Sequence, residues 1–161
     1  MNLCEITLNL EKPISNFVKP NPLFVSPYAT LGEVAKKMAE EKKEVAIVRE
    51  DNGEIKGLVT SADLFDALRS YLLGKDLLEQ VPSDIRDLKV TTVMKGYYTK
   101  EFMEACGLTG SNVCISLGAE ENISNAIRVM SVAGINHILI TGEGGVIGTL
   151  SDSDLVKVFL D

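Results

Sequence analysis

Two stretches of the chain place a hydroxyl residue three positions before an aspartate and start on glycine. Residues three apart lie on one face of a helical turn, so a hydroxyl and a carboxylate with this spacing can both reach one ligand. Ser and Thr are also preferred N-caps, and the free N–H groups of a first helical turn attract anions. The pattern therefore predicts either a plain helix cap or a site for a ligand with hydroxyl and anionic groups. The stretches are residues 57–64, with Thr60 and Asp63, and residues 148–155, with Ser151 and Asp154.

The surroundings of the two stretches are duplicated as well. Each is preceded by an apolar run and a glycine-containing turn, which together are typical of a β-hairpin. Further upstream, apolar residues fall at helical spacing in both halves. The repeat predicts strand, helix, strand, strand, helix, written twice. The apolar runs are residues 45–48 and 138–140, the turns are residues 51–53 and 142–145, and the helical positions are Leu31, Val34, Ala35 and Met38 and then Ile123, Ala126, Ile127 and Met130.

The order and duplication of these motifs resemble a tandem pair of CBS domains, together called a Bateman module. The resemblance implies an α/β fold in which two β-α-β-β-α CBS units pack as a pseudo-two-fold module, with their sheets face to face. It is carried by residues 24–31, 57–63, Val93 and Met94, 134–137 and 148–154. The expected organisation is an N-terminal strand or arm at 1–13, a first CBS domain at 14–73, a linker at 74–89 and a second CBS domain at 90–160.

The second copy departs from the first by an insertion at about residues 95–112. Residues 99–106 can form a short helix. Its apolar side would consist of Tyr97, Tyr98, Phe102 and Met103. The insertion is either a surface excursion that packs on its own domain, or a lid or docking surface, because long loops often carry function.

The resemblance implies that the clefts between the CBS units bind adenosine-containing ligands: AMP, ADP, ATP or S-adenosylmethionine. No obligatory cofactor is implied. By position, Asp63 and Asp154 would accept from ribose hydroxyls, while Thr60 and Ser151 would lie near phosphate. A carboxylate suits two adjacent hydroxyls, since hydrogen bonds to charged acceptors are strong. If these carboxylates lie at the surface, replacing them should change folding little.

Family members often place a basic or polar residue just before the second strand of each unit. Lys43 and Glu44 hold that place in the first half, and Asn136 and His137 hold it in the second. We expect Glu44 to stand where His137 stands, which would oppose a phosphate in the first half. Asp152 adds a negative charge to the second turn. His137 is as well explained as a half-buried structural residue.

Composition limits the other functions. The net charge of −7 argues against a broad nucleic-acid surface, which needs basic residues to replace counterions. No apolar run approaches the length of a membrane span, and the N-terminus lacks the pattern of a signal peptide, so we expect a cytoplasmic protein. Cys4, Cys106 and Cys114 form no Cys-x-x-Cys pair and predict neither a disulfide framework nor a metal site. No nucleophile–base pair or P-loop is present, which argues against an enzyme.

Three functions remain open: a sensor that binds an adenine nucleotide and signals to a separate, unidentified protein, a scaffold with empty clefts, and a small enzyme with unrecognised residues. A homodimer is expected, because helix faces left unused in one module need cover. The candidate contacts are Leu68, Tyr71 and Leu72 from the first half, with Val158 and Phe159 from the second.

Overall fold

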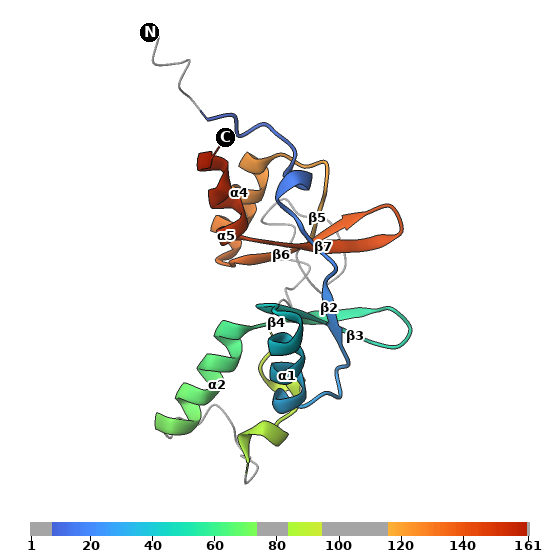
Figure 1. Ribbon diagram of the computed structural model, residues 1–161, viewed down its shortest axis with the longest axis vertical. Helices are drawn as coiled ribbons and strands as arrows, with labels where there is room; N and C mark the ends of the chain where they lie inside the picture. Colours follow the sequence, from blue (N-terminus) through green and yellow to red (C-terminus); the bar gives the residue numbers. More distant parts are fainter. Residues whose placement is uncertain (1–7, 74–83, 95–115, 161) are drawn as a thin grey trace. The chain divides into compact units, whose positions relative to one another are not determined.

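The computed structural model describes residues 8–73, 84–94 and 116–160, which form two compact units (Figure 1). The first unit consists of residues 23–73 and 84–94, and the second unit of residues 8–22 and 116–160. Among these residues, no helix combines the length and apolar composition needed to cross a bilayer.

The first unit is a three-stranded sheet with two helices, in the predicted order of strand, helix, strand, strand, helix. Strand β2 runs parallel to β3, and β4 runs antiparallel to β3, which is the central strand. The short 3-10 helices η3 (Ile85–Asp87) and η4 (Val90–Thr92) complete the unit. The main elements are β2 (Leu23–Val25), α1 (Leu31–Glu41), β3 (Val45–Arg49), β4 (Ile55–Thr60) and α2 (Ser61–Leu73).

The second unit repeats this order and adds one edge strand. Strands β5 and β6 are parallel, β7 is antiparallel to β6, and the two-residue strand β1 pairs antiparallel with β7. The predicted α/β fold of two β-α-β-β-α units is therefore confirmed. The elements are η2 (Ile14–Phe17), β1 (Lys19–Pro20), β5 (Ser116–Gly118), α4 (Ile123–Ala133), β6 (His137–Gly142), β7 (Gly145–Ser151), α5 (Asp152–Leu155) and η5 (Val156–Leu160).

Local signals explain where the first helix of each unit begins and ends. Helix α1 starts at Thr30, whose hydroxyl accepts from Glu33 N at 3.3 Å, and α4 starts at Asn122, whose side chain caps Asn125 N at 2.8 Å. Both helices end at a left-handed residue, Lys42 in one and Gly134 in the other. These caps satisfy backbone groups that the helix itself leaves unpaired.

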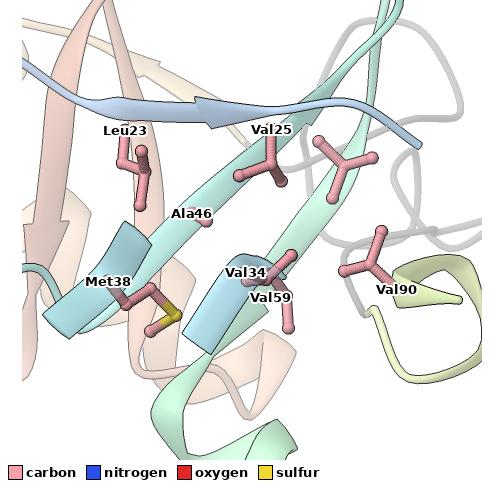
Figure 2. Close-up of a cluster of buried hydrophobic side chains, with 8 residues drawn as sticks. Leu23, Val25, Val34, Met38, Ala46, Val59 and Val90 are labelled. Carbon is pink, nitrogen blue, oxygen red and sulfur yellow. The ribbon is translucent and has the colours of Figure 1, made fainter. Parts of the chain in front are cut away.

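The core of the first unit lies between α1 and the sheet, and a residue from outside the repeat closes it (Figure 2). Apolar side chains from one face of α1 meet those of the strands, as their spacing predicts. The last member, Val90, comes from η4 and is fully buried. The cluster consists of Leu23, Val25, Val34, Met38, Ala46, Val48, Val59 and Val90.

The second unit is closed in the same way by the segment that precedes the first repeat. Val90 N donates to Ala29 O at 2.8 Å in the first unit, and Ile14 N donates to Glu121 O at 2.8 Å in the second. Ile14 is also fully buried. The two anchors occupy equivalent positions, so each unit is completed by a segment distant from it in sequence. The expected domain boundaries stay a prediction.

The predicted N-terminal strand is not found in residues 8–13, which form a turn and an isolated bridge from Pro13 to Asn122. The carbonyl groups of Leu10 and Lys12 accept from Ser124 N and Ile123 N, at 2.9 and 3.0 Å. These two carbonyls therefore pair with the first N–H groups of α4 and not with a neighbouring strand. The predicted insertion at 95–112 and most of the linker lie outside the described residues.

Apolar side chains point outward on α2, as expected for a helix that a partner covers. Leu68, Tyr71 and Leu72 are 56%, 50% and 82% exposed, and Phe159 of the second unit is 73% exposed. The expectation was wrong for Val158, which is buried because it faces inward from η5.

A mostly apolar groove of about 410 Å³ lies beside Val158 in the second unit, lined by residues that include Leu8, Met130 and Leu155.

The buried anchor of the second unit gives a stability prediction. Ile14→Ala should lower the free energy of unfolding by about 2–5 kcal/mol, because it removes a fully buried side chain and leaves a cavity. Urea denaturation would measure the loss. Ile127→Ala is the matched control, since Ile127 is 40% exposed on α4 and its truncation should cost clearly less. Equal losses for the two variants would contradict the anchoring role of Ile14.

Candidate functional site

The turn between β4 and α2 holds Thr60 and Asp63 in direct contact with each other. Thr60 donates from its backbone N and its hydroxyl to Asp63 Oδ2, at 2.9 and 3.0 Å. Asp63 N donates back to the Thr60 hydroxyl at 3.2 Å. The Asp63 carboxylate lies in the first turn of α2, where the helix dipole favours negative charge. It is buried, with 4% of the residue exposed.

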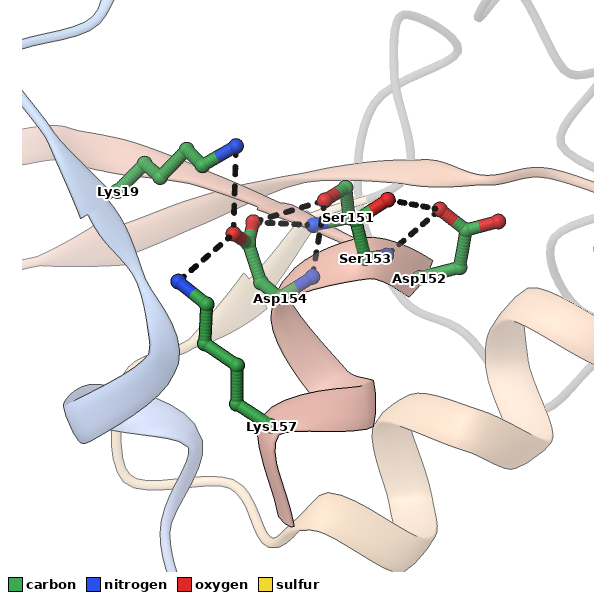
Figure 3. Close-up of polar contacts among 6 residues, drawn as sticks. All are labelled: Lys19, Ser151, Asp152, Ser153, Asp154 and Lys157. Atoms are coloured by element: carbon green, nitrogen blue, oxygen red, sulfur yellow. Dashed lines mark hydrogen bonds and ion pairs between the residues drawn. The ribbon is translucent and has the colours of Figure 1, made fainter. Parts of the chain in front are cut away.

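The turn between β7 and α5 repeats this arrangement with Ser151 and Asp154 (Figure 3). Ser151 N and Ser151 Oγ both donate to Asp154 Oδ2 at 2.9 Å, and Asp154 N donates to Ser151 Oγ at 3.2 Å. The two residues form a capping box, in which the cap and the third helical residue satisfy each other's backbone groups. Asp154 is 1% exposed and Ser151 is 3% exposed.

Asp63 and Asp154 do not lie at the surface, so the expectation that replacing a surface carboxylate changes folding little does not apply to them. The predicted spacing brings hydroxyl and carboxylate together in both turns, but they bond to each other and the carboxylates are buried. One oxygen of each carboxylate is engaged by the turn itself. Any further partner of Asp154 must use its other oxygen, Oδ1, which accepts no hydrogen bond within the structure.

Two lysines that the sequence analysis did not single out lie against Asp154 Oδ1. Lys19 Nζ is 3.3 Å from this oxygen, and Lys157 Nζ is 4.0 Å from it (Figure 3). Lys157 follows Asp154 by three residues on the same helical face, which the spacing could have indicated. Lys19 could not be found in this way, because the β1–β7 pairing brings it there.

Gly148 explains how β1 comes so close to β7. A Cβ at this position would overlap the carbonyl oxygen of Lys19, so only glycine admits the neighbouring backbone. The register pairs Pro20 with Gly148 and Lys19 with Thr149, two residues before Ser151. The glycine that starts the second motif thus helps to set Lys19 beside the buried carboxylate.

Comparison with known proteins identifies the family. The model of the CBS domain matches residues 14–70 and 111–161, which is more than half of the sequence. The chain belongs to the CBS domain family. A comparison with curated proteins gives no match.

Solved structures share the CBS fold at low sequence identity. An uncharacterised conserved protein from Pyrococcus horikoshii is 21% identical, with a TM-score of 0.67 and coverage of 95% of this chain and 96% of that one. The CBS domain pair of protein MJ0100, solved with 5′-methylthioadenosine and S-adenosyl-L-methionine, is 14% identical, with a TM-score of 0.64 and coverage of 91% and 94%. CBSX2, solved in complex with AMP, is 18% identical, with a TM-score of 0.62 and coverage of 92% and 96%.

The strand register of the two CBS units corrects the expected match between Glu44 and His137. His137 pairs with Ser151 in the second unit, and Val45 pairs with Thr60 in the first, so His137 corresponds to Val45. Glu44 corresponds instead to Asn136, because the carbonyl groups of both accept from the residue after the cap, at 2.9 and 3.1 Å. His137 was expected just before the second strand, but β6 begins at His137 itself, as β3 begins at Val45.

The remaining candidate residues lie at the start of the second strand of each CBS unit. Lys43 and His137 are half-buried, and the side chain of Asn136 is exposed. Asp152 is exposed, and its Oδ1 accepts from Ser153 N at 2.7 Å within the same turn. Among the described residues, no group of three or more His, Cys, Asp or Glu side chains could hold a metal ion.

Burial of the second carboxylate predicts a cost in stability when its charge is removed. Asp154→Asn should lower the free energy of unfolding by about 2 kcal/mol, because it breaks the ion pair with Lys19 and weakens the charged capping bonds. Thermal or urea denaturation would measure the loss. The exposed neighbour Asp152 offers the matched control, Asp152→Asn, which should change stability much less. An unchanged free energy of unfolding in Asp154→Asn would contradict a stabilising role for the carboxylate.

Proposed function

We propose that this CBS pair is a cytoplasmic regulatory module that binds an adenosine-containing ligand, of the AMP, ADP or ATP class, and signals to a partner protein. The observation that carries the proposal is the duplicated turn, in which a cap hydroxyl holds a buried carboxylate at the start of a helix. Two solved CBS structures are complexes with adenosine compounds, which supports this ligand class. S-adenosylmethionine is the alternative ligand.

In this proposal Asp63 and Asp154 accept from the ribose hydroxyls. Thr60 and Ser151 hold each carboxylate in place and lie near the phosphate. Hydrogen bonds to a carboxylate are stronger than those to a neutral group, so a preformed acceptor suits a ribose diol. Lys43, Asn136 and His137 are proposed as further contacts. The proposal includes no catalysis.

Ligand binding tests this proposal directly. AMP, ADP, ATP, NAD and S-adenosylmethionine would be screened by thermal shift, since a ligand that binds the native state raises its apparent stability. Asp63→Asn or Asp154→Asn should then weaken binding by roughly ten- to a hundredfold in calorimetry, because a charge-assisted bond is lost.

The controls are Asp66→Asn and Asp152→Asn, which change a partly exposed and an exposed carboxylate of the same helices. Circular dichroism would establish that each variant is folded at the assay temperature. If the wild type binds but neither Asp63→Asn, Asp154→Asn nor the double variant changes the affinity, the assigned residues are wrong. If no adenosine compound binds at millimolar concentration, the scaffold function replaces the sensing function.

A homodimer is the second part of the proposal, and the outward face of α2 supports it. Phe65, Leu68 and Leu72 recur at helical spacing on this face and are 62%, 56% and 82% exposed. Contiguous exposed apolar side chains mark interaction sites, and closed two-fold pairing is the commonest way to cover them.

Leu68→Glu should therefore shift the molar mass in light scattering from that of a dimer to that of a monomer. The introduced charge would be buried without a partner in the interface, which is costly. Lys36→Glu, on the exposed side of α1, introduces the same residue and should leave the mass unchanged. A wild type that is monomeric at micromolar concentration would refute the dimer.

A further inference from the structure

We propose that residues 1–7 of this chain bind in the apolar groove of the second unit, with the side chains of Cys4 and Ile6 facing the wall of the groove. The groove has a volume of about 410 Å³ and is lined by residues of α4, α5 and η5 together with Leu8 and Leu10. The inference is independent of the adenosine ligand. It supplies an occupant for a surface that the proposed function leaves uncovered.

The wall of the groove is a surface that calls for cover. The side chains of Ile127, Val156 and Phe159 line it and remain exposed. Contiguous exposed apolar side chains mark interaction sites. The described lining is apolar except for Ser131, Asn136 and Asp152. An occupant that fits must therefore present an apolar side to the groove.

The chain itself already lines the groove through Leu8 and Leu10. The carbonyl group of Leu10 accepts from Ser124 N at 2.9 Å, at the start of α4. The next residue, Glu11, accepts from Asn122 Nδ2 at 2.9 Å through its carboxylate. These bonds fix this part of the chain against α4, so the residues that precede Leu8 begin at the groove itself.

The sequence that leads to Leu10 alternates between apolar and polar residues. In an extended chain, every second side chain lies on the same face. Leu8 and Leu10 show that the apolar face of this pattern is the one that meets the groove. Continued towards the start of the chain, the same face carries Cys4 and Ile6. The apolar members are Cys4, Ile6, Leu8 and Leu10, and the polar members are Glu5, Thr7 and Asn9.

The length of the segment also suits the groove. Four extended residues, 4–7, span about 13 Å. Helix α4, which forms one wall, has 11 residues and is therefore about 16 Å long. Cys4 can thus lie against the wall while the chain stays fixed at Leu10.

Covalent attachment favours this segment over a second copy of the chain as the occupant. A segment joined directly to the rim of its site is held there at an effective concentration in about the millimolar range. A second copy must instead give up translational and rotational freedom to bind. The segment therefore fills the groove at protein concentrations at which a second copy would leave it.

The thiol of Cys4 reports whether the segment is bound. The wild-type chain would be labelled with N-ethylmaleimide, and peptide mass spectrometry would follow Cys4 separately from Cys106 and Cys114. The reference is a synthetic peptide of residues 1–9. Cys4 should react roughly ten- to a hundredfold more slowly in the protein, because burial of one isoleucine side chain favours the bound state by about that factor.

Two variants of the segment separate its faces. Ile6→Ser should bring the Cys4 rate close to that of the peptide, because it removes the apolar anchor. Thr7→Ser is the control on the polar face and should keep the slow rate. Equal rates for these two variants would contradict the assigned orientation of the segment.

A matched pair of variants tests the groove. Val156→Ser changes a lining residue that is 55% exposed, and Val132→Ser changes one that is 60% exposed on α4, outside the described lining. Val156→Ser should raise the Cys4 rate by about fourfold, which corresponds to the loss of one buried CH₂ group. Val132→Ser should leave the rate unchanged. Circular dichroism would establish that both variants are folded.

Three results would overturn the inference and leave the proposed function untouched. The first is a wild-type Cys4 rate equal to that of the peptide. The second is an equal effect of the two valine variants, which would place the segment elsewhere. The third is protection that falls when the protein is diluted, which would assign the groove to a second copy.

Discussion

The buried carboxylate at each strand-to-helix turn is the constraint on which the surrounding structure depends. A charge removed from water is costly unless hydrogen bonds and opposite charges compensate it. At Asp154 the compensation requires three elements at once: the end of β7 supplies Ser151, the helix supplies its first turn, and β1 supplies Lys19. Gly148 is needed as well, because it admits the backbone of β1. A change in any of these parts would leave the charge less well compensated.

The interior of each unit also depends on a residue from outside the repeat. In the first unit, Val90 comes from outside the repeat and completes the hydrophobic cluster. In the second unit, Ile14 also comes from outside the repeat and, like Val90, is fully buried. Their backbone N–H groups bond at equivalent places, to Ala29 O and Glu121 O. The duplication therefore extends to how each core is closed, beyond the motifs themselves.

The two turns have kept their geometry and diverged in charge. The distances within the hydroxyl–carboxylate pairs agree closely, which is expected if the capping box is needed for the fold of either unit. One helical turn later, Asp66 stands in the first unit and Lys157 in the second. Positions next to a conserved geometry can vary in charge without loss of the fold.

The sequence by itself determined the features that depend on hydrogen bonds between near neighbours. The cap at Ser151 and the order of strands and helices both follow from local spacing, because helical turns and hairpins are short-range structures. Only the tertiary structure decided the burial of Asp63 and Asp154, the inward position of Val158 and the approach of Lys19 to Asp154. It also matched His137 to Val45, since the pairing across each hairpin shows that both residues begin a strand. The approach of Lys19 depends on pairing between β1 and β7, which are remote in sequence, and local patterns carry no information about such pairing.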